Sequence, residues 1–385
     1  MQVLFLTQVL PYPPDSGPKV KSFNVLKYLA RHYEVTLVSF VRGDQSVEVR
    51  RLGQICRTVH TVPMARSLLF GQPWMMLRDE RIAMRRLVDR LAAEHKFDVV
   101  HADQLNMAQY AQRLRSSRKV LDAHNALWLL YRRLWETLPP GPERALLGRD
   151  WKLLKSYEGR MCREFDAVIA VSDEDKTALE EAMGMSRDIA VIPIAIDGEE
   201  TPMVNRALEA NHIVHLGTMY WPPNIDGIMW FVREIFPTIR GERPDVALDV
   251  IGARPPRELR RLHGCSMGVN VTGYVKDVQP YLEQAGVFIV PLRAGGGMRV
   301  KILEALARGL PVVTTSLGCE GIKVKHERHA LIADSPEAFA QAALRLLEDH
   351  AFADELGRNG RRLIESAYDY RTACKPLDEV YRAQR

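Results

Sequence analysis

The chain has 385 residues, of which 46% are hydrophobic and 26% are charged. This length exceeds what one hydrophobic core usually organises, and the mixed composition excludes disordered and fibrous proteins, so we expect two globular domains. The formal net charge is +5, but residues 42–163 contain 23 Lys and Arg against 13 Asp and Glu. The basic charge is therefore concentrated in the first half of the chain.

The sequence shows no sign of a membrane-spanning or secreted protein. No apolar run reaches the roughly 18 to 20 residues of a membrane span, and Met1 leads directly into VLFLT without a basic leader. The cysteines lack CxxC spacing, which argues against a disulfide framework and a zinc site; they are Cys56, Cys162, Cys265, Cys319 and Cys374. We expect reduced thiols in a cytoplasmic protein.

Two basic stretches, 66–87 and 128–163, interleave Trp, Leu and Met with Arg and Lys. Surfaces that contact anionic lipid often have this composition. A solvated helix face, whose long basic side chains lie over core residues, has it equally. Both interpretations remain open, and the first places the protein at the inner face of the membrane. Nucleic acid is not expected as a partner, because no recognised binding signature accompanies the charge.

Short apolar runs separated by helical patterns predict two successive series of parallel strands. The first series comprises VLFLT (3–7), EVTLVSF (34–40), DVVHA (98–102), KVLDAH (119–124), DAVIAVS (166–172) and IAVIPI (189–194). The second comprises HIVHLG (212–217), VALDVIG (246–252), VNVTGYV (269–275), VFIVPL (287–292), PVVTT (311–315) and HALIAD (329–334). The expected fold is α/β, with two Rossmann-like domains facing across a cleft.

The polar segment 197–212 separates the two series and is predicted to be an interdomain linker. Three helical patterns follow the last strand, and the final one is expected to return to the first domain. We therefore expect an N-terminal domain at 1–200, a C-terminal domain at 211–365 and a returning helix at 366–385.

The segment RAGGGMRVKILEALARG (293–309) has the pattern of a strand-to-helix loop followed by a helix. Glycines allow a loop to approach a ligand closely, and the helix N-terminus directs N–H groups and partial positive charge at the same point. Arg299 and Lys301 in the first turn add full positive charges, and Gly309 suits a left-handed C-cap. This geometry favours phosphate.

Helical periodicity places Lys301, Glu304 and Arg308 in one polar stripe, with apolar residues on the other side. Such a stripe faces either bulk solvent or a wet ligand site. Taken alone, the pattern favours Glu304 as a surface residue in a weak ion pair, and it does not separate the two cases.

The ordered set of motifs resembles the family 4 glycosyltransferases, which are retaining enzymes of the GT-B fold that use nucleotide-activated sugars. The resemblance spans nearly the whole chain. The N-terminal segments that carry it are LFLTQVLPYPPDSGPKVKSFNVLKYLA, LDAHNALW, FDAVIAVSDED and VIPIAIDG. In the second half it rests on HLGTMYWPPNIDGIMWF, VTGYVKDVQPYLEQAGVFIVPL and the EALARGLPVV core.

The resemblance implies roles for the residues of the 293–309 segment. Glu304 matches the second of a pair of family glutamates and would hold the ribose of the nucleotide. The first glutamate of that pair would fall at Gly296, so backbone N–H groups at Gly296, Gly297 and Met298 are expected to replace it.

The phosphate-binding Arg and Lys of the family are missing from HLGTMYWPPN, the segment in which they commonly lie. Arg299 and Lys301 are therefore the expected catalytic cations on the diphosphate.

Other matches extend the implied site. Gly17 corresponds to a glycine-rich turn near the diphosphate, and His124 corresponds to a histidine that faces the reacting sugar or the acceptor. The His124 match implies a catalytic role; without it, a histidine capping a helix start would be the more ordinary interpretation. The turn with Tyr274 and Val275 corresponds to the contact with the base, and Glu320 lies near the sugar pocket.

The resemblance implies transfer of a hexosyl group from a nucleoside diphosphate sugar to a hydroxyl of a glycan or polyprenyl-linked acceptor, with anomeric retention. No Asp-rich metal motif is evident, so neither a metal nor another cofactor is expected. Two alternatives share the donor site: a sugar-nucleotide epimerase, and a non-catalytic nucleotide-sugar-binding subunit. A nicotinamide dehydrogenase is disfavoured, because the loop after the first strand is Pro-rich and lacks GxGxxG.

Overall fold

A computed structural model describes residues 1–64, 81–115, 117–207, 209–264 and 268–383. The chain divides into two compact units, one formed by Met1–Ala195 with Tyr370–Arg385 and the other by Ile196–Asp369. The boundaries expected from sequence were 200, 211 and 365, and the segment taken as a linker lies within the second unit. Each unit is described by itself.

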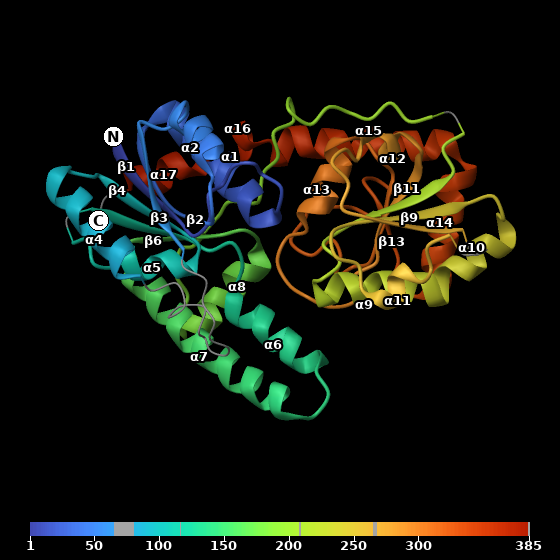
Figure 1. Ribbon diagram of the computed structural model, residues 1–385, viewed down its shortest axis with the longest axis horizontal. Helices are drawn as coiled ribbons and strands as arrows, with labels where there is room; N and C mark the ends of the chain where they lie inside the picture. The colour runs from blue at the N-terminus through green and yellow to red at the C-terminus, as the bar shows by residue number, and fades with distance from the viewer. Residues whose placement is uncertain (65–80, 116, 208, 265–267, 384–385) are drawn as a thin grey trace. The chain divides into compact units, whose positions relative to one another are not determined.

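Unit 1 is built on a seven-stranded parallel sheet in the order β3-β2-β1-β4-β5-β6-β7 (Figure 1). The strands are β1 (Gln2–Thr7), β2 (Glu34–Val41), β3 (Thr58–Pro63), β4 (Val99–Asp103), β5 (Arg118–Asp122), β6 (Ala167–Ala170) and β7 (Ala190–Val191). The sequence predicted every strand but β3. This edge strand, TVHTVP, is mostly half-buried and carries His60, so it lacks the continuous apolar run of its neighbours.

Helices cover both faces of this sheet, as the continuous burial of β1 from Val3 to Thr7 requires. Val3 and Phe5 belong to one hydrophobic core, and Leu4 and Leu6 belong to the other. The helices are α1 (Gly17–His32), α2 (Ser46–Gly53), α4 (Ile82–Glu94), α5 (Leu105–Ala111), α6 (Leu127–Thr137), α7 (Pro142–Glu164) and α8 (Asp173–Met183).

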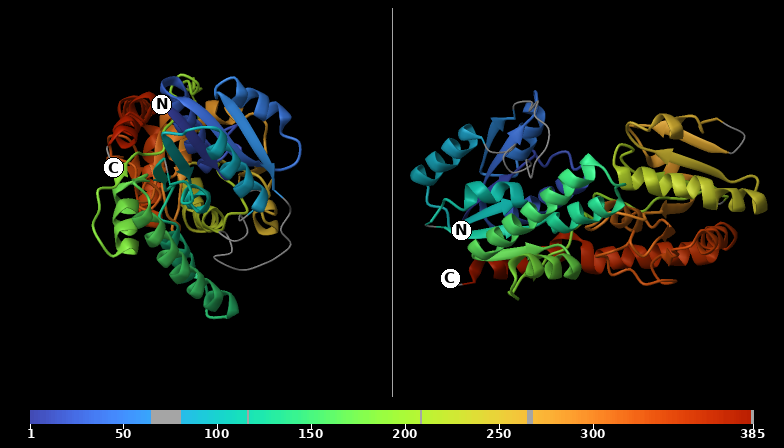
Figure 2. Two further views of the ribbon diagram at one scale, coloured as in Figure 1. Left: turned by 90° about the vertical axis from the view of Figure 1, so that its left-hand side faces the viewer. Right: turned by 90° about the horizontal axis from the view of Figure 1, so that it is seen from below.

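Helices α6 and α7 form a hairpin that extends away from the sheet (Figures 1 and 2). Its base is fixed by Glu158 of α7, a buried carboxylate that accepts hydrogen bonds from the backbone N–H groups of Leu127 and Trp128, each at 3.0 Å. Burial raises the pKa of Glu158 to about 8, although these two N–H groups act in the opposite direction. The contact satisfies two N–H groups at the first turn of α6.

The predicted return of the C-terminal helix to the first domain is confirmed. Helices α16 (Tyr370–Ala373) and α17 (Pro376–Arg382) belong to unit 1, and Leu377 and Tyr381 are buried in the core that contains Phe5. The Tyr28 hydroxyl donates to Asp378 at 3.0 Å, and the Tyr33 hydroxyl donates to the other oxygen of the same carboxylate.

Unit 2 contains a six-stranded parallel sheet in the order β10-β9-β8-β11-β12-β13, and all six strands were predicted. They are β8 (His212–Leu216), β9 (Ala247–Ile251), β10 (Val269–Gly273), β11 (Ala285–Val290), β12 (Val312–Thr314) and β13 (Leu331–Ile332). The α-helices are α9 (Pro222–Trp230), α10 (Phe236–Glu242), α11 (Arg257–Arg260), α12 (Gln279–Glu283), α13 (Val300–Ala307), α14 (Pro336–Glu348) and α15 (His350–Leu363). The expected two-domain α/β fold is therefore confirmed.

Among the described residues, no helix has the length and apolar character that crossing a bilayer requires. Four of the cysteines are buried free thiols, namely Cys56, Cys162, Cys319 and Cys374, and Cys265 lies outside the described residues. Most of the basic stretch 66–87 also lies outside them.

We expect Leu377→Ala to destabilise unit 1 by about 2 to 5 kcal/mol, because the side chain is fully buried between α17 and the sheet. Urea unfolding followed by fluorescence measures the change. Glu379→Ala, at an exposed position of the same helix, is the matched control and should change stability by less than about 0.5 kcal/mol. Equal stability of the two variants would show that α17 is only loosely attached to unit 1.

Candidate functional site

The loop that precedes α13 is shaped by glycines and by Arg299. Gly295 and Gly297 have φ angles of 113° and 76°, in the left-handed region that other residues rarely adopt. The Arg299 guanidinium folds back onto the loop and donates from Nη1 to the carbonyl oxygens of Gly296 and Gly297. The helix begins at Val300, two residues later than predicted. Arg299, the predicted diphosphate ligand, thus stabilises the loop in this structure.

Lys301 is in the first turn of α13, and its ammonium group lies beside Gly217, just after β8, where it contacts the neutral amide of Asn224. Its Nζ donates to Asn224 Oδ1 at 3.0 Å, and Asn224 Nδ2 donates to the Thr218 carbonyl oxygen at 3.0 Å. A Cβ atom at Gly217 would lie 2.8 Å from Lys301 Nζ, so glycine is what leaves room for the ammonium group. Sequence analysis missed Asn224 and Gly217, because neither stands out until the loop is folded.

Burial lowers the pKa of Lys301 to about 7, and the Arg299 charge acts in the same direction, while Glu304 opposes it. The fully buried His215 of β8 lies near this charge. Burial, reinforced by the Lys301 charge, lowers the pKa of His215 to about 3, and its Nδ1 lies 3.1 Å from the Ile289 carbonyl oxygen. Lys301 is thus a lysine whose pKa lies near neutrality, beside a histidine that burial keeps uncharged.

Lys301, Glu304 and Arg308 line one small cavity of about 110 Å³ in unit 2. Its remaining lining is apolar: Leu216, Val278, Leu282, Phe288, Ala305 and Leu310. Burial raises the pKa of Glu304, although the charges of Arg308 and Lys301 act in the opposite direction. The polar stripe, which periodicity alone assigned more readily to solvent, therefore faces a cavity that combines apolar walls, a carboxylate and two cations.

The other predicted donor residues of unit 2 are not among those that line this cavity. Met298 is buried. Tyr274 is 75% exposed and Val275 is half-buried, and Val278, slightly further along the chain, contributes the lining side chain. Glu320 is half-buried in the turn that follows β12. The assignments to the base and the sugar remain predictions.

In unit 1, His124 is held at the carboxyl ends of the central strands. Its Nε2 lies 2.8 Å from Asp103 Oδ1, and Asp103 Oδ2 accepts hydrogen bonds from the hydroxyls of Thr7 (2.8 Å) and Ser22 (2.7 Å). Burial acts to raise the pKa of Asp103, but the charge and hydrogen bond of His124, together with the charge of His101, lower it below its usual value. The His124 ring is therefore oriented by a buried carboxylate that the sequence analysis did not identify.

A second buried carboxylate, Asp122, forms an ion pair with Lys21 of α1, whose side chain is 1% exposed. Burial would raise the pKa of Asp122, but Lys21 and the nearby histidines hold it well below its usual range. His101 Nε2 lies 3.5 Å from the same carboxylate, and His101 Nδ1 lies 2.8 Å from the hydroxyl of Tyr381.

His101, Asp103 and Asp122 are close enough to share a metal ion. Asp122 is already paired with the Lys21 ammonium group. The Asp103 carboxylate is already hydrogen-bonded to two hydroxyls and an imidazole. The Lys21 ammonium group already supplies a positive charge to this cluster. These contacts fit a structural ion-pair network better than a metal centre.

Gly17, the remaining predicted residue of unit 1, is the first residue of α1 and is half-buried. It follows the loop with the prolines, as predicted, and Pro18 occupies the first turn of the helix.

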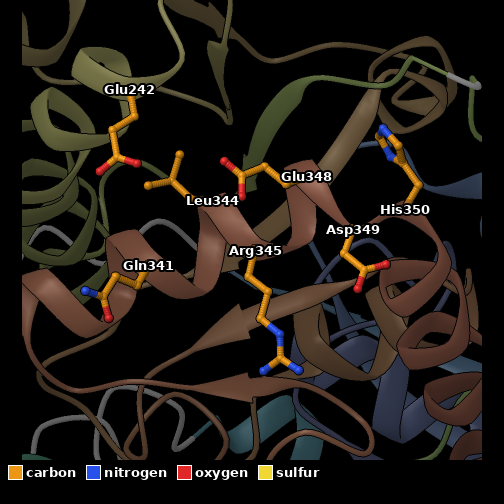
Figure 3. A pocket seen from close by; sticks show the side chains of 7 residues that line it. All are labelled: Glu242, Gln341, Leu344, Arg345, Glu348, Asp349 and His350. Atoms are coloured by element: carbon orange, nitrogen blue, oxygen red, sulfur yellow. The ribbon is translucent and has the colours of Figure 1, made fainter.

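A larger hollow of about 540 Å³ lies elsewhere in unit 2, between α10 and the junction of α14 with α15 (Figure 3). It is lined by Glu242, Gln341, Leu344, Arg345, Glu348, Asp349 and His350. Arg345 pairs with Glu327, and Asp349 accepts from the Phe352 N–H at the start of α15. Two of its polar groups thus stabilise local structure, and it contains no predicted site residue.

Two protein-family models match the chain. The model described as "Glycosyltransferase Family 4" matches residues 22–200, and "Glycosyl transferases group 1" matches residues 210–349. The chain is a family 4 glycosyltransferase.

Known proteins are similar in sequence to this glycosyltransferase over more than half of its length. A 44.6 kDa protein of the cps region of Klebsiella pneumoniae is 20% identical over 96% of each chain. A GDP-mannose-dependent α-(1-6)-phosphatidylinositol monomannoside mannosyltransferase of Mycobacterium tuberculosis is 26% identical over 60% of this chain and 66% of its own.

Solved structures confirm the GT-B fold. Sucrose-phosphate synthase of Thermosynechococcus elongatus superposes with a TM-score of 0.75 at 16% identity, covering 99% of this chain and 98% of its own. HepE of Anabaena in complex with UDP gives a TM-score of 0.71 at 15% identity, covering 99% of both chains.

We expect Lys301→Met to stabilise unit 2 of the glycosyltransferase most at low pH. Below a folded pKa of about 7, Lys301 is charged in both the folded and the unfolded state, and the native protein bears the full cost of burying that charge. The cost falls as the pH rises from 7 toward the unfolded value of about 10.5. Urea midpoints at pH 6 and pH 9.5 measure this. The variant's gain should shrink between them, whereas the exposed control Lys276→Met should show no such dependence.

Proposed function

We propose that this glycosyltransferase moves a hexosyl group from a nucleoside diphosphate sugar to an acceptor hydroxyl and retains the anomeric configuration. The observation that carries the proposal is the cavity lined by Lys301, Glu304 and Arg308 along α13, the helix that follows the glycine-rich loop. Apolar walls suit a nucleoside, a carboxylate suits the two hydroxyls of a ribose, and the cations suit a diphosphate.

In this proposal Lys301 and the N-terminus of α13 bind the diphosphate. The leaving group gains negative charge as the glycosidic bond breaks, so cations fixed in advance stabilise the transition state more than the ground state. An anion beside Lys301 raises the pKa of the lysine above its unliganded value of about 7, so donor binding above neutral pH takes up a proton. In this proposal Lys301 becomes positively charged when the diphosphate binds.

His124 faces the reacting sugar or the acceptor hydroxyl in the proposed reaction, and Glu304 binds the ribose. The proposal assigns no enzymatic nucleophile and requires no metal, because Lys301 and backbone N–H groups meet the diphosphate charge. The nucleotide remains to be identified: HepE was crystallised with UDP and UDP-glucose, whereas the mycobacterial relative is named for GDP-mannose.

Calorimetry with a panel of nucleoside diphosphate sugars tests the donor site. One nucleotide should bind at about micromolar strength, and Lys301→Ala and Glu304→Ala should each weaken it by roughly 1 to 3 kcal/mol, the cost of losing a charged hydrogen bond. Arg345→Ala, which removes an exposed and ion-paired arginine of the same unit, is the control and should bind normally. Normal binding by both site variants would place the donor elsewhere.

The anomeric configuration of the product, read by NMR, tests retention, and full activity in the presence of a chelator is expected. Formation of an epimerised sugar nucleotide without any acceptor would instead identify an epimerase. Donor binding without turnover, across a panel of lipid-linked and free glycan acceptors, would identify a non-catalytic subunit.

A lipid-linked acceptor would be reached through the α6–α7 hairpin. The exposed face of α7 carries Arg149, Lys152 and Arg160 together with two large apolar side chains, Leu146 (46% exposed) and Leu153 (42% exposed). Cations interleaved with exposed leucines are suited to an anionic bilayer surface. This part of stretch 128–163 is the described surface that supports membrane contact.

We expect the double variant Arg149→Gln/Lys152→Gln to bind phosphatidylglycerol-containing vesicles about 30-fold more weakly, at roughly 1 kcal/mol for each charge near the surface. Co-sedimentation measures the effect, with pure phosphatidylcholine vesicles as the reference. The control is Arg257→Gln/Arg260→Gln, two exposed arginines of α11 in unit 2. Equal losses in the two double variants would indicate general electrostatic attraction and would refute a docking role for the hairpin.

A further inference from the structure

Gln104 has an unusual backbone conformation next to His124. It follows β4 directly and has φ 79° and ψ 153°, a region that is populated almost only by glycine. Its N–H donates to the Asp122 carbonyl oxygen at 3.0 Å, which continues the pairing of β4 with β5. Glycine would occupy this position without strain, so the presence of glutamine points to a use for its side chain.

The Gln104 side chain reaches the predicted catalytic histidine. Its Nε2 lies 3.3 Å from His124 Nδ1, and on the opposite edge of the ring His124 Nε2 lies 2.8 Å from Asp103 Oδ1. Asp103 is ionised and only accepts hydrogen bonds, because its pKa is lowered. The proton on Nε2 therefore belongs to the imidazole, and in the neutral ring Nδ1 offers a lone pair to the Gln104 amide.

We propose that Gln104 is a positioning residue, which together with Asp103 fixes the tautomer of the neutral His124 ring, with its proton on Nε2 and a lone pair on Nδ1. This inference rests on the proposed function, in which His124 faces the reacting sugar or the acceptor. A ligand hydroxyl that takes the place of the Gln104 amide then finds an acceptor nitrogen. The amide donates a hydrogen bond to Nδ1 but does not ionise, so it leaves the charge of His124 unchanged.

The charges around His124 come from three elements. Asp103 on β4 contacts the ring, and Asp122 on β5 and His101 on β4 belong to the same buried group. The Lys21 charge on α1 is paired with Asp122. A carboxylate in place of the Gln104 amide would be the one new charge, and it would accept a hydrogen bond from the protonated Nδ1 and so favour the imidazolium form.

NMR correlation of the imidazole nitrogens with their ring protons tests the inference on the full-length protein, with His124→Gln used to assign the signals. The native ring should show the Nε2–H tautomer. Gln104→Glu should raise the titration midpoint of His124 by about one pH unit or more and shift the pH–rate profile in the same direction. Gln109→Glu, on the neighbouring helix α5, is the matched control and should leave both unchanged.

The variant Gln104→Gly distinguishes a positioning role of the side chain from a structural role of this position. It should raise the unfolding midpoint because it relieves the backbone strain, yet lower the transfer rate about tenfold or more at an unchanged KM for the donor. A native Nδ1–H tautomer, an unshifted midpoint in Gln104→Glu, or full activity in Gln104→Gly would overturn the inference. The NMR result is independent of turnover. A native protein with the expected tautomer and no transferase activity would therefore contradict the proposed function and leave the positioning of His124 standing.

Discussion

The buried ion pair between Lys21 and Asp122 is the interaction on which the polar centre of unit 1 depends. An isolated charge in a parallel sheet covered on both faces is strongly unfavourable, and each partner of this pair makes the burial of the other tolerable. Because Lys21 lies on α1 and Asp122 ends β5, the pair also fixes the helix against the sheet. Asp103 and His124 are then ordered beside it by hydrogen bonds to Thr7, Ser22 and one another.

The environment of Lys301 in unit 2 is different. Lys301 donates to a neutral amide, that of Asn224, and burial brings its pKa to about 7. The carboxylate of Glu304 offsets this effect only in part. Lys21 is thus paired with a carboxylate inside the fold, whereas Lys301 donates to an amide and has a pKa near neutrality. This difference, rather than the mere presence of a lysine on the helix, distinguishes a structural site from a candidate ligand site.

Sequence patterning predicted the strands well because both sheets are parallel and buried, so their strands are apolar along most of their length. The half-buried edge strand β3 lacks that signal. Periodicity correctly grouped Lys301, Glu304 and Arg308 but gave no information on what they face, since a cavity and bulk solvent impose the same polar pattern. Arg299 was expected to point to a ligand, and its contacts with loop carbonyls depend on glycine torsions that only the folded loop reveals.

The discontinuity of unit 1 bears on how the chain folds during synthesis. Its core is completed by α16 and α17, in which Leu377 and Tyr381 pack against residues made at the start of translation. The ribosome must therefore release all of unit 2 before the first core can close. Until then, the apolar side chains around Phe5 that α17 covers are left without this helix, and unit 2 can complete its own sheet first. The core around Phe5 is therefore completed last, although its first strand is the first to be synthesised.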